Sequence, residues 1–286
     1  LFIFILLISS VFYDKLKNSK FLLFYMILVL FIIVSIRYNI GTDYPHYNEF
    51  FKKVRPFTLH PNYSTGNEYF EPLFQYVVAI LKYLVTSPVF YFSFWGFITL
   101  IFTWKGIKEQ SPNYLLSIFI FYCIFYHHYL FNTIRQGVAM GIFLFSIKYI
   151  LDRKFIRVLI ISIFSSLFHS SGILIIGAYF MSMIKFKNRI TLIFLLVSSL
   201  FIWKFGIGEK IFIMFVQQFQ EYLPNLVGYF RLFLLPHTFI QVLQRVLVII
   251  PLIYFYPNLS KDDRFSHLFS IYVWGTIIYF SFGFFS

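Results

Sequence analysis

Residues 132–150 read NTIRQGVAMGIFLFSIKYI, and this stretch holds the two features that decide the fold. Residues 136–151 form an apolar run that is typical of a membrane helix. Arg135 stands directly before that run, in the first turn of the expected helix. Gly137 and Gly141 lie four residues apart and allow a neighbouring helix to approach closely. The stretch predicts a helix that packs tightly and begins with a cation.

The whole chain has the composition of an integral membrane protein. Of its 286 residues, 59% are hydrophobic and only 12% are charged, whereas a soluble domain averages about 25% charged residues. The apolar runs are long and lack the alternation that a membrane β-barrel requires. We therefore predict an all-α, polytopic integral membrane helical bundle with about 8–10 membrane helices.

Basic clusters separate the apolar runs and indicate the topology. The apolar runs occupy residues 1–13, 21–36, 88–104, 114–131, 136–151, 158–184, 190–205, 231–256 and 267–286. The basic clusters occupy residues 14–20, 105–110, 152–157, 185–189 and 260–264. Because Lys and Arg are enriched in cytoplasmic loops, we place all five clusters on the cytoplasmic side. This placement also accounts for the net charge of +13. The basic residues do not form a stripe along any one element, so nothing in their arrangement suggests nucleic-acid binding.

Two segments do not fit this pattern as simple spans. Segment 71–86 is too short to cross, and we predict an amphipathic helix in the membrane interface. Its apolar face would consist of Leu73, Val77, Ile80, Leu81 and Leu84. Run 158–184 has basic clusters at both ends, so we predict a re-entrant helical hairpin that turns at residues 170–172.

The expected organisation is a single membrane domain over residues 1–286. Residues 39–70 would form an extracytoplasmic loop, and residues 206–230 a second extracytoplasmic segment. No secretory signal is predicted at the first segment, which lacks a basic start and a small-residue cleavage site.

Several classes of chemistry lack their motifs. Cys123 is the only cysteine, so a disulfide within the chain is excluded. The sequence contains no HExxH pattern, no phosphate-binding glycine loop and no GxSxG nucleophile turn. We expect no metal and no cofactor.

The first polar candidates follow the second apolar run. Arg37 ends that run and either reaches out to lipid headgroups or serves a site. Asp43 lies within reach of Arg37 after a tight turn at Gly41. Tyr44 and Tyr47 are either interface aromatics or stacking surfaces for sugar rings.

Arg135 is the strongest candidate for a functional side chain. It could snorkel, with Asn132 capping the helix, but an arginine at a helix N-terminus also suits an anion. The guanidinium fork and the free backbone N–H groups both favour phosphate. Gln136 follows it in the same turn.

His169 lies at the expected tip of the re-entrant hairpin. Taken alone, it is either a satisfied core histidine or a neutral imidazole that acts as a general base. Glu71 is either a charge at a helix N-terminus or an acceptor for a sugar hydroxyl. Arg231 and Arg245 lie 14 residues apart on one helical face, and they either snorkel and pair internally or contribute to the site.

An ordered set of motifs resembles one known family. In chain order the motifs are RYNIGTDYPHY (37–47), EPLF (71–74), NTIRQGVAMGIFLFSIKYI (132–150), RKF (153–155) and SLFHSSGIL (166–174). Together they resemble the EpsG/Wzy-type polysaccharide polymerases, over roughly residues 20 to 190.

The resemblance implies a polymerase for O-antigen, capsule or another bacterial surface polysaccharide. Its substrate would be an oligosaccharide repeat unit on undecaprenyl diphosphate, and its partners would include membrane lipid and a chain-length regulator, but no nucleic acid. It would be a metal-independent membrane glycosyltransferase of the bacterial cytoplasmic membrane, with its active site facing the periplasm or exterior.

Each candidate residue then has an expected role. Because the leaving group is a lipid diphosphate, guanidinium groups can stabilise its charge in place of a metal. We expect Arg37 and Arg135 to bind the diphosphate, with Arg231 and Arg245 as second choices. His169 is the expected general base, and Asp43 is the alternative candidate for that role. The substrate-positioning candidates are Gln136, Tyr44, Tyr47, Glu71 and Asn132.

Two other classes of function remain as alternatives. A flippase or transporter of lipid-linked oligosaccharides would need arginines through the whole membrane depth. A polysaccharide membrane acyltransferase would also use a histidine in a membrane cavity, but would not need several phosphate-binding arginines.

Overall fold

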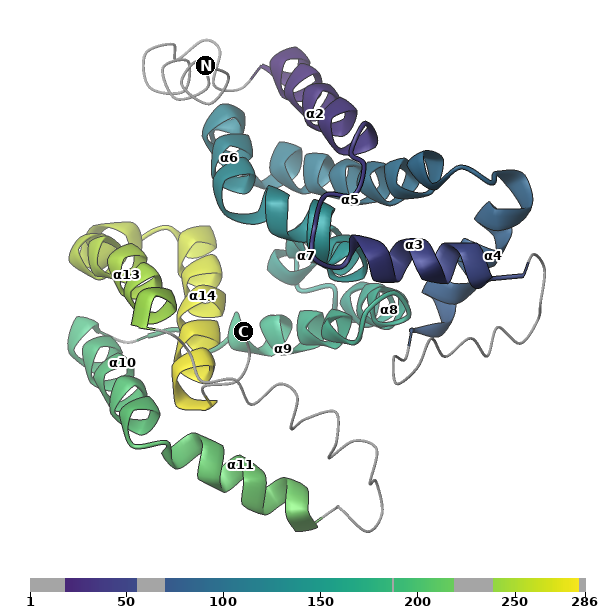
Figure 1. The fold of residues 1–286 in the computed structure, drawn as a ribbon. Helices are drawn as coiled ribbons and strands as arrows, with labels where there is room; N and C mark the ends of the chain where they lie inside the picture. Colours follow the sequence, from purple (N-terminus) through teal and green to yellow (C-terminus); the bar gives the residue numbers. More distant parts are fainter. Residues whose placement is uncertain (1–18, 56–69, 187, 219–238, 283–286) are drawn as a thin grey trace. The chain divides into compact units, whose positions relative to one another are not determined.

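A computed structural model describes residues 19–55, 70–186, 188–218 and 239–282 (Figure 1). All regular structure within these ranges is helical, which confirms the all-α prediction. The chain divides into two compact units, Leu1–Gly177 and Ala178–Ser286.

The first unit contains the N-terminal helices and most of the motifs. Its elements are α2 (Lys20–Ser35), α3 (Tyr44–Lys53), α4 (Pro72–Leu84), α5 (Pro88–Gln110), α6 (Tyr114–Ile120), the π-helices η1 (Phe121–Tyr126) and η2 (His128–Asn132), α7 (Ile134–Leu151), α8 (Phe155–Ser166), the 3₁₀-helix η3 (Ser170–Ile173) and the start of α9 (Leu174–Met181). Helix α3 lies inside segment 39–70, which was expected to be a loop.

One face of α2 forms part of the core of this unit. Leu23, Met26, Leu30 and Val34 are buried, and their spacing of three and four residues places them on one side of the helix. This side packs against α5 and α6. The opposite side exposes large apolar side chains, as expected for a helix that faces lipid.

Helices α5 and α7 approach each other closely at glycines. A Cβ atom built at Gly141 of α7 would lie 2.9 Å from the backbone oxygen of Thr99 in α5. Reciprocally, a Cβ at Gly106 of α5 would lie 2.9 Å from the backbone carbon of Leu144 in α7. Gly137 does not serve this contact, because its Cβ would meet the backbone oxygen of Tyr129 at 2.5 Å. Small residues thus set the helix separation, as they do in membrane bundles.

We expect Gly141→Ala to lower the free energy of unfolding by about 1–3 kcal/mol, because the added methyl group forces the two backbones apart. Gly275→Ala is the matched control, since its Cβ would meet nothing within 4 Å in the described part of the chain. Thermal unfolding in detergent compares the two variants. Equal melting temperatures would contradict the close contact.

Helix α4 lies within the segment predicted to be an amphipathic helix, and the residues of its predicted apolar face are partly buried and partly exposed. Phe74, Val78 and Leu81 are buried, whereas Ile80 and Leu84 are exposed. Apolar residues occupy more than one side of this helix, so the pattern alone could not select the packed side. The selection comes from aromatic neighbours: the Phe74 ring stacks on Trp95 of α5 (4.7 Å) and lies 5.9 Å from Phe50 of α3. Its position in a membrane interface stays a prediction.

The run 158–184 is broken in its middle. Helix α8 ends at Ser166, η3 begins at Ser170, and Leu167–His169 connect them. The chain turns back so that Ser162 Oγ donates to the Gly172 carbonyl (2.9 Å). Re-entrant insertion into a membrane stays a prediction.

Two helices of the described chain are long and apolar enough to cross a membrane, Ile134–Leu151 and Val242–Leu259. Several shorter apolar helices accompany them, among them α2, α4 and α8. The larger number of spans expected from the sequence stays a prediction.

The second unit contains α10 (Arg189–Lys204), α11 (Ile207–Gln218), α13 (Phe239–Leu259) and α14 (Asp263–Phe282). Its core contains Leu192 and Leu196 of α10, Ile249 of α13, and Phe269 and Val273 of α14. Helix α11 lies in the expected extracytoplasmic segment 206–230, of which residues 219–230 lie outside the described ranges.

Side chains of α13 and α14 hold the segment between α9 and α10 by its carbonyl groups. His267 Nδ1 donates to the Ser182 carbonyl (2.7 Å), Trp274 Nε1 to that of Ile184 (3.0 Å), and Tyr256 Oη to that of Phe186 (2.6 Å). Every second carbonyl is therefore bound, which satisfies backbone acceptors of a short connection.

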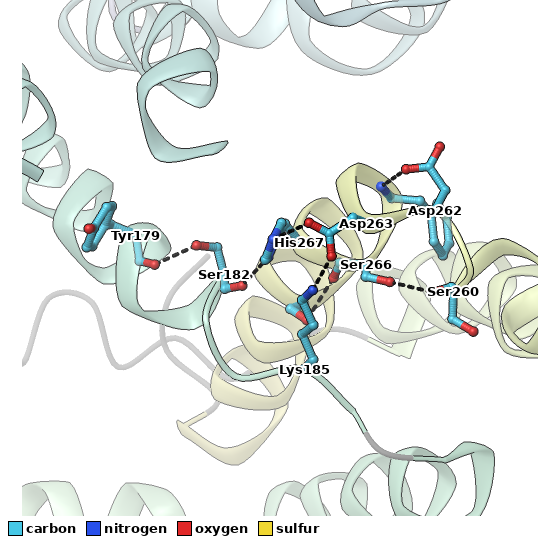
Figure 2. Close-up of polar contacts among 10 residues, drawn as sticks. Tyr179, Ser182, Lys185, Ser260, Asp262, Asp263, Ser266 and His267 are labelled. Carbon is cyan, nitrogen blue, oxygen red and sulfur yellow. Dashed lines mark hydrogen bonds and ion pairs between the residues drawn. The ribbon is translucent and has the colours of Figure 1, made fainter. Parts of the chain in front are cut away.

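A charged group binds the middle of this connection (Figure 2). Asp263, the first residue of α14, pairs with Lys185, and its other oxygen lies 3.3 Å from His267 Nε2. The Lys185 ammonium group lowers the pKa of the Asp263 carboxyl, and His267 adds to this effect. A carboxylate at the N-terminus of a helix also interacts favourably with the helix dipole.

Candidate functional site

Two chain segments cap each other and form the base of the site. The first backbone N–H groups of α4, on Leu73 and Phe74, donate to the Leu167 carbonyl (3.1 and 3.3 Å). In return, Glu71 Oε1 accepts from the backbone N–H of Ser170 (3.0 Å), the first residue of η3. These bonds satisfy donors that a helix N-terminus leaves free, and they fix the turn that carries His169.

Glu71 also holds Arg135. Its second oxygen, Oε2, pairs with Arg135 Nη1, and Tyr47 Oη lies 3.3 Å from Arg135 Nε. The guanidinium carbon lies 4.6 Å from the centre of the Phe70 ring. The side chains of Arg135 and Glu71 are 18% and 9% exposed, so the pair reaches the surface through the arginine. The arrangement fixes a cation in the first turn of α7.

Residues from three helix N-termini therefore take part in the contacts of Glu71. Glu71 immediately precedes α4, Arg135 is the second residue of α7, and Ser170 is the first residue of η3. Helix N-termini carry partial positive charge, and a guanidinium group adds a full charge. The position is therefore suited to an anionic group.

His169 lies half-buried in the turn before η3 and caps that helix. Its Nδ1 accepts from the backbone N–H of Ser171 (3.2 Å) and lies 2.8 Å from Ser171 Oγ. Burial lowers the pKa of His169, and the nearby Arg135 lowers it further, whereas Glu71 opposes the shift. The imidazole is therefore neutral at pH 7.

The turn after α2 docks on the chain that precedes α7. Asn132 Oδ1 accepts from the Thr42 backbone N–H (2.8 Å) and from Thr42 Oγ1 (3.3 Å). Gly41 has a φ of 108° and packs so closely that a Cβ would lie 2.0 Å from the Phe131 oxygen. Only glycine fits both requirements. Asn132 does not cap α7 as expected; Thr133 is its N-cap residue and makes no side-chain capping bond.

Arg37 is a buried brace of this turn. Only 2% of the residue is exposed, and Nη1 donates to the Leu130 carbonyl. Its guanidinium carbon lies 4.3 Å from the centre of the Phe92 ring and 5.4 Å from that of Phe131. Burial lowers the pKa of Arg37 to about 10, so it stays charged. The snorkelling alternative is wrong, because the side chain points into the protein rather than toward headgroups.

The hydrogen-bond donors of the Arg37 guanidinium group are only partly satisfied. Its Nε and Nη2 atoms are buried and have no hydrogen-bond partner among the described residues. The faces of aromatic rings provide part of the missing stabilisation through cation–π contacts.

The two tyrosines of α3 are packing residues. Tyr44 is 4% exposed and stacks on Phe92 (4.4 Å), and Tyr47 is 5% exposed and contacts Phe70 and Phe74. We therefore do not assign sugar stacking to either ring. Tyr47 instead orients Arg135 through its hydroxyl group.

The remaining candidates are placed as follows. Asp43 is half-buried at the N-terminus of α3, where Oδ1 accepts from Thr42 Oγ1 (3.1 Å). Gln136 is half-buried in the first turn of α7. Arg245 belongs to the second unit, where its guanidinium carbon lies 3.6 Å from the centre of the Tyr279 ring. Arg231 lies outside the described residues.

The sequence reasoning missed three contributors to the site. Phe70 lies under the Arg135 guanidinium, the Leu167 carbonyl caps α4, and Ser171 binds the His169 ring. The signal for Ser171 was present, since a side-chain acceptor two residues before a helical N–H is a capping pattern. Phe70 and Leu167 carried no signal in a chain with 43 phenylalanines.

Within the described ranges, no group of three or more His, Cys, Asp or Glu side chains could hold a metal ion. The expectation of metal-independent chemistry stays a prediction.

Comparison with known proteins confirms the family resemblance. A sequence model of the EpsG family matches residues 2–286. Neither the curated proteins nor the solved structures give a match. The match covers nearly the whole chain, including the C-terminal third in which the sequence motifs were absent, and it supports a polysaccharide-polymerase-like role in a membrane. The protein therefore belongs to the EpsG family.

Proposed function

We propose that the protein polymerises lipid-linked oligosaccharide repeat units of a bacterial surface polysaccharide. It transfers a glycan from a donor on undecaprenyl diphosphate to a sugar hydroxyl of an acceptor unit. The bundle crosses the cytoplasmic membrane several times, and the site faces the periplasm or exterior. Membership of the EpsG family supports the general role.

The observation that carries the proposal is the fixed guanidinium of Arg135. Glu71 and Tyr47 hold it at the N-terminus of α7, beside the N-terminus of η3 and the ring of His169. Negative charge develops on the diphosphate as the sugar–oxygen bond breaks, and a positively charged group of the protein stabilises it. A preoriented guanidinium at a helix N-terminus supplies that charge without a metal ion.

The reaction balances without an external co-reactant. The acceptor hydroxyl oxygen forms a bond to the anomeric carbon of the donor sugar. The bond from that carbon to the diphosphate oxygen breaks, and its electron pair leaves with the lipid diphosphate. The hydroxyl proton ends on the departing diphosphate or in solvent.

Polymerisation by the purified protein tests the proposal. We expect the protein in detergent to extend a defined undecaprenyl-diphosphate repeat unit in the presence of a metal chelator, and gel electrophoresis to resolve a ladder of products. A ladder that appears only after addition of a divalent cation would contradict the metal-independent mechanism. The absence of any ladder would contradict the proposed function.

The surface glycan of cells lacking the protein separates the alternatives. Loss of a polymerase leaves single repeat units on the surface. Loss of a flippase leaves none, and loss of an acyltransferase leaves full-length polymer without a substituent. A chain-length regulator as partner would be revealed by a change in the length distribution when both proteins are reconstituted together.

A further inference from the structure

The hydrogen bonds of His169 determine which ring nitrogen carries a proton. The backbone N–H of Ser171 can only donate, and it points at Nδ1 from 3.2 Å. Nδ1 must therefore present a lone pair, and the Ser171 hydroxyl at 2.8 Å can donate to the same atom. A neutral imidazole whose Nδ1 is an acceptor carries its hydrogen on Nε2.

The other ring nitrogen, Nε2, is not used by these bonds. Nε2 has no hydrogen-bond partner among the described residues, and His169 is half-buried. The ring lies beside the Glu71 carboxylate that joins Ser170 to Arg135. His169 therefore offers an N–H donor within the cluster whose charged groups, Glu71 and Arg135, act on its ring.

This tautomer is unsuited to the role of general base. Nε2 has no lone pair while it carries hydrogen. Nδ1 can take a proton only if the bonds from Ser171 to that atom are broken, which removes the cap of η3. Burial and the charge of Arg135 also disfavour the protonated ring.

We propose that His169 is a neutral hydrogen-bond donor whose Nε2–H binds a phosphate oxygen of the lipid-diphosphate donor, and that it does not accept the proton of the acceptor hydroxyl. The proposal rests on the polymerase function proposed above. His169 and Arg135 then form two parts of one diphosphate site, and His169 keeps its proton while the glycosyl bond is transferred.

Two amide substitutions distinguish the roles of the two ring nitrogens. In His169→Gln, the side-chain amide reaches the position of Nε2 and can donate there. In His169→Asn, the side-chain oxygen takes the position of Nδ1 and keeps the cap, but no donor reaches the substrate. We expect Gln to retain activity within about 10-fold of the wild type, and Asn and Ala to lose at least about 100-fold.

The base role predicts another result. Glutamine cannot accept a proton at neutral pH, so His169→Gln would lose about 10²- to 10⁴-fold. Equal loss in the Gln and Asn variants, with wild-type melting temperatures, would overturn the proposal.

The pH profile adds a readout that a structural role would not change. Wild-type activity should fall at acid pH, as protonation of Nδ1 breaks the cap, by no more than the loss of about 10-fold expected of His169→Gln. The Gln variant lacks that cap at every pH and should show no such fall. The charged groups beside the ring, Glu71 and Arg135, are unchanged in this comparison. A fall of the same size in both proteins would assign it to another group.

Nitrogen-15 NMR tests the geometry even if the Gln variant does not fold. In protein labelled at its seven histidines, the signal absent from His169→Asn should report a neutral ring with hydrogen on Nε2. Hydrogen on Nδ1 would overturn the proposal. This measurement needs no turnover, so failure of the wild-type protein to polymerise would count against the proposed function alone.

Discussion

Replacing both members of the Arg135–Glu71 pair by glutamine is expected to abolish polymerisation while leaving the protein folded. The double variant contains no unpaired charge, and the amide at position 71 can still accept from the Ser170 backbone N–H. It lacks the guanidinium that we assign to the diphosphate. We expect a loss of about 10²- to 10³-fold in the rate of chain extension, measured with a lipid-linked repeat unit at saturating acceptor.

The single variants separate catalysis from stability. Arg135→Gln leaves the Glu71 carboxylate nearly buried, so it should lose both stability and activity. Glu71→Gln keeps the guanidinium and can still accept from Ser170, so it should keep more activity than any variant without Arg135. If the double variant polymerises at the wild-type rate, Arg135 is only a structural cation and the proposed mechanism is wrong.

Arg37→Ala is expected to have the largest effect on stability. The substitution removes a side chain that is 2% exposed, leaves a cavity between Phe92 and Phe131, and leaves the Leu130 carbonyl without its donor. Together these losses should lower the free energy of unfolding by about 3–5 kcal/mol. Thermal unfolding in detergent measures the difference.

Arg37→Met fills the same space without a charge and should recover part of the stability, because two of the guanidinium nitrogens are unsatisfied in any case. Tyr38→Ala is the control, since the adjacent Tyr38 side chain is 77% exposed and its removal should change the melting temperature little.

The kinetics of Arg37→Met decide between a brace and a ligand. If Arg37 only supports the turn after α2 against the chain that precedes α7, the folded variant should keep its KM for the lipid-linked donor. A large rise in KM at an unchanged melting temperature would show that Arg37 binds the diphosphate, as the sequence suggested.

The local features of the chain were predictable because they depend on neighbours in sequence. Long apolar runs specify helices, and the FHSSG motif interrupts one of them, so a break near Ser170 followed from the residues alone. The polar residues of the motifs also identified Arg135, Glu71 and His169 as candidates. Which side of α4 is buried did not follow, because apolar residues lie on both sides of it and the choice depends on Trp95 and Phe50.

By itself, the sequence determined that the protein is helical, that it is apolar enough for a membrane, and which family it belongs to. Only the tertiary structure decided that Glu71 joins Arg135 to Ser170, that Arg37 is buried against Leu130, and which nitrogen of His169 is free. The physical reason is distance along the chain. The partners of Glu71 are 64 and 99 residues away, and that of Arg37 is 93 residues away, so no local pattern encodes them and only packing of the helices brings them together.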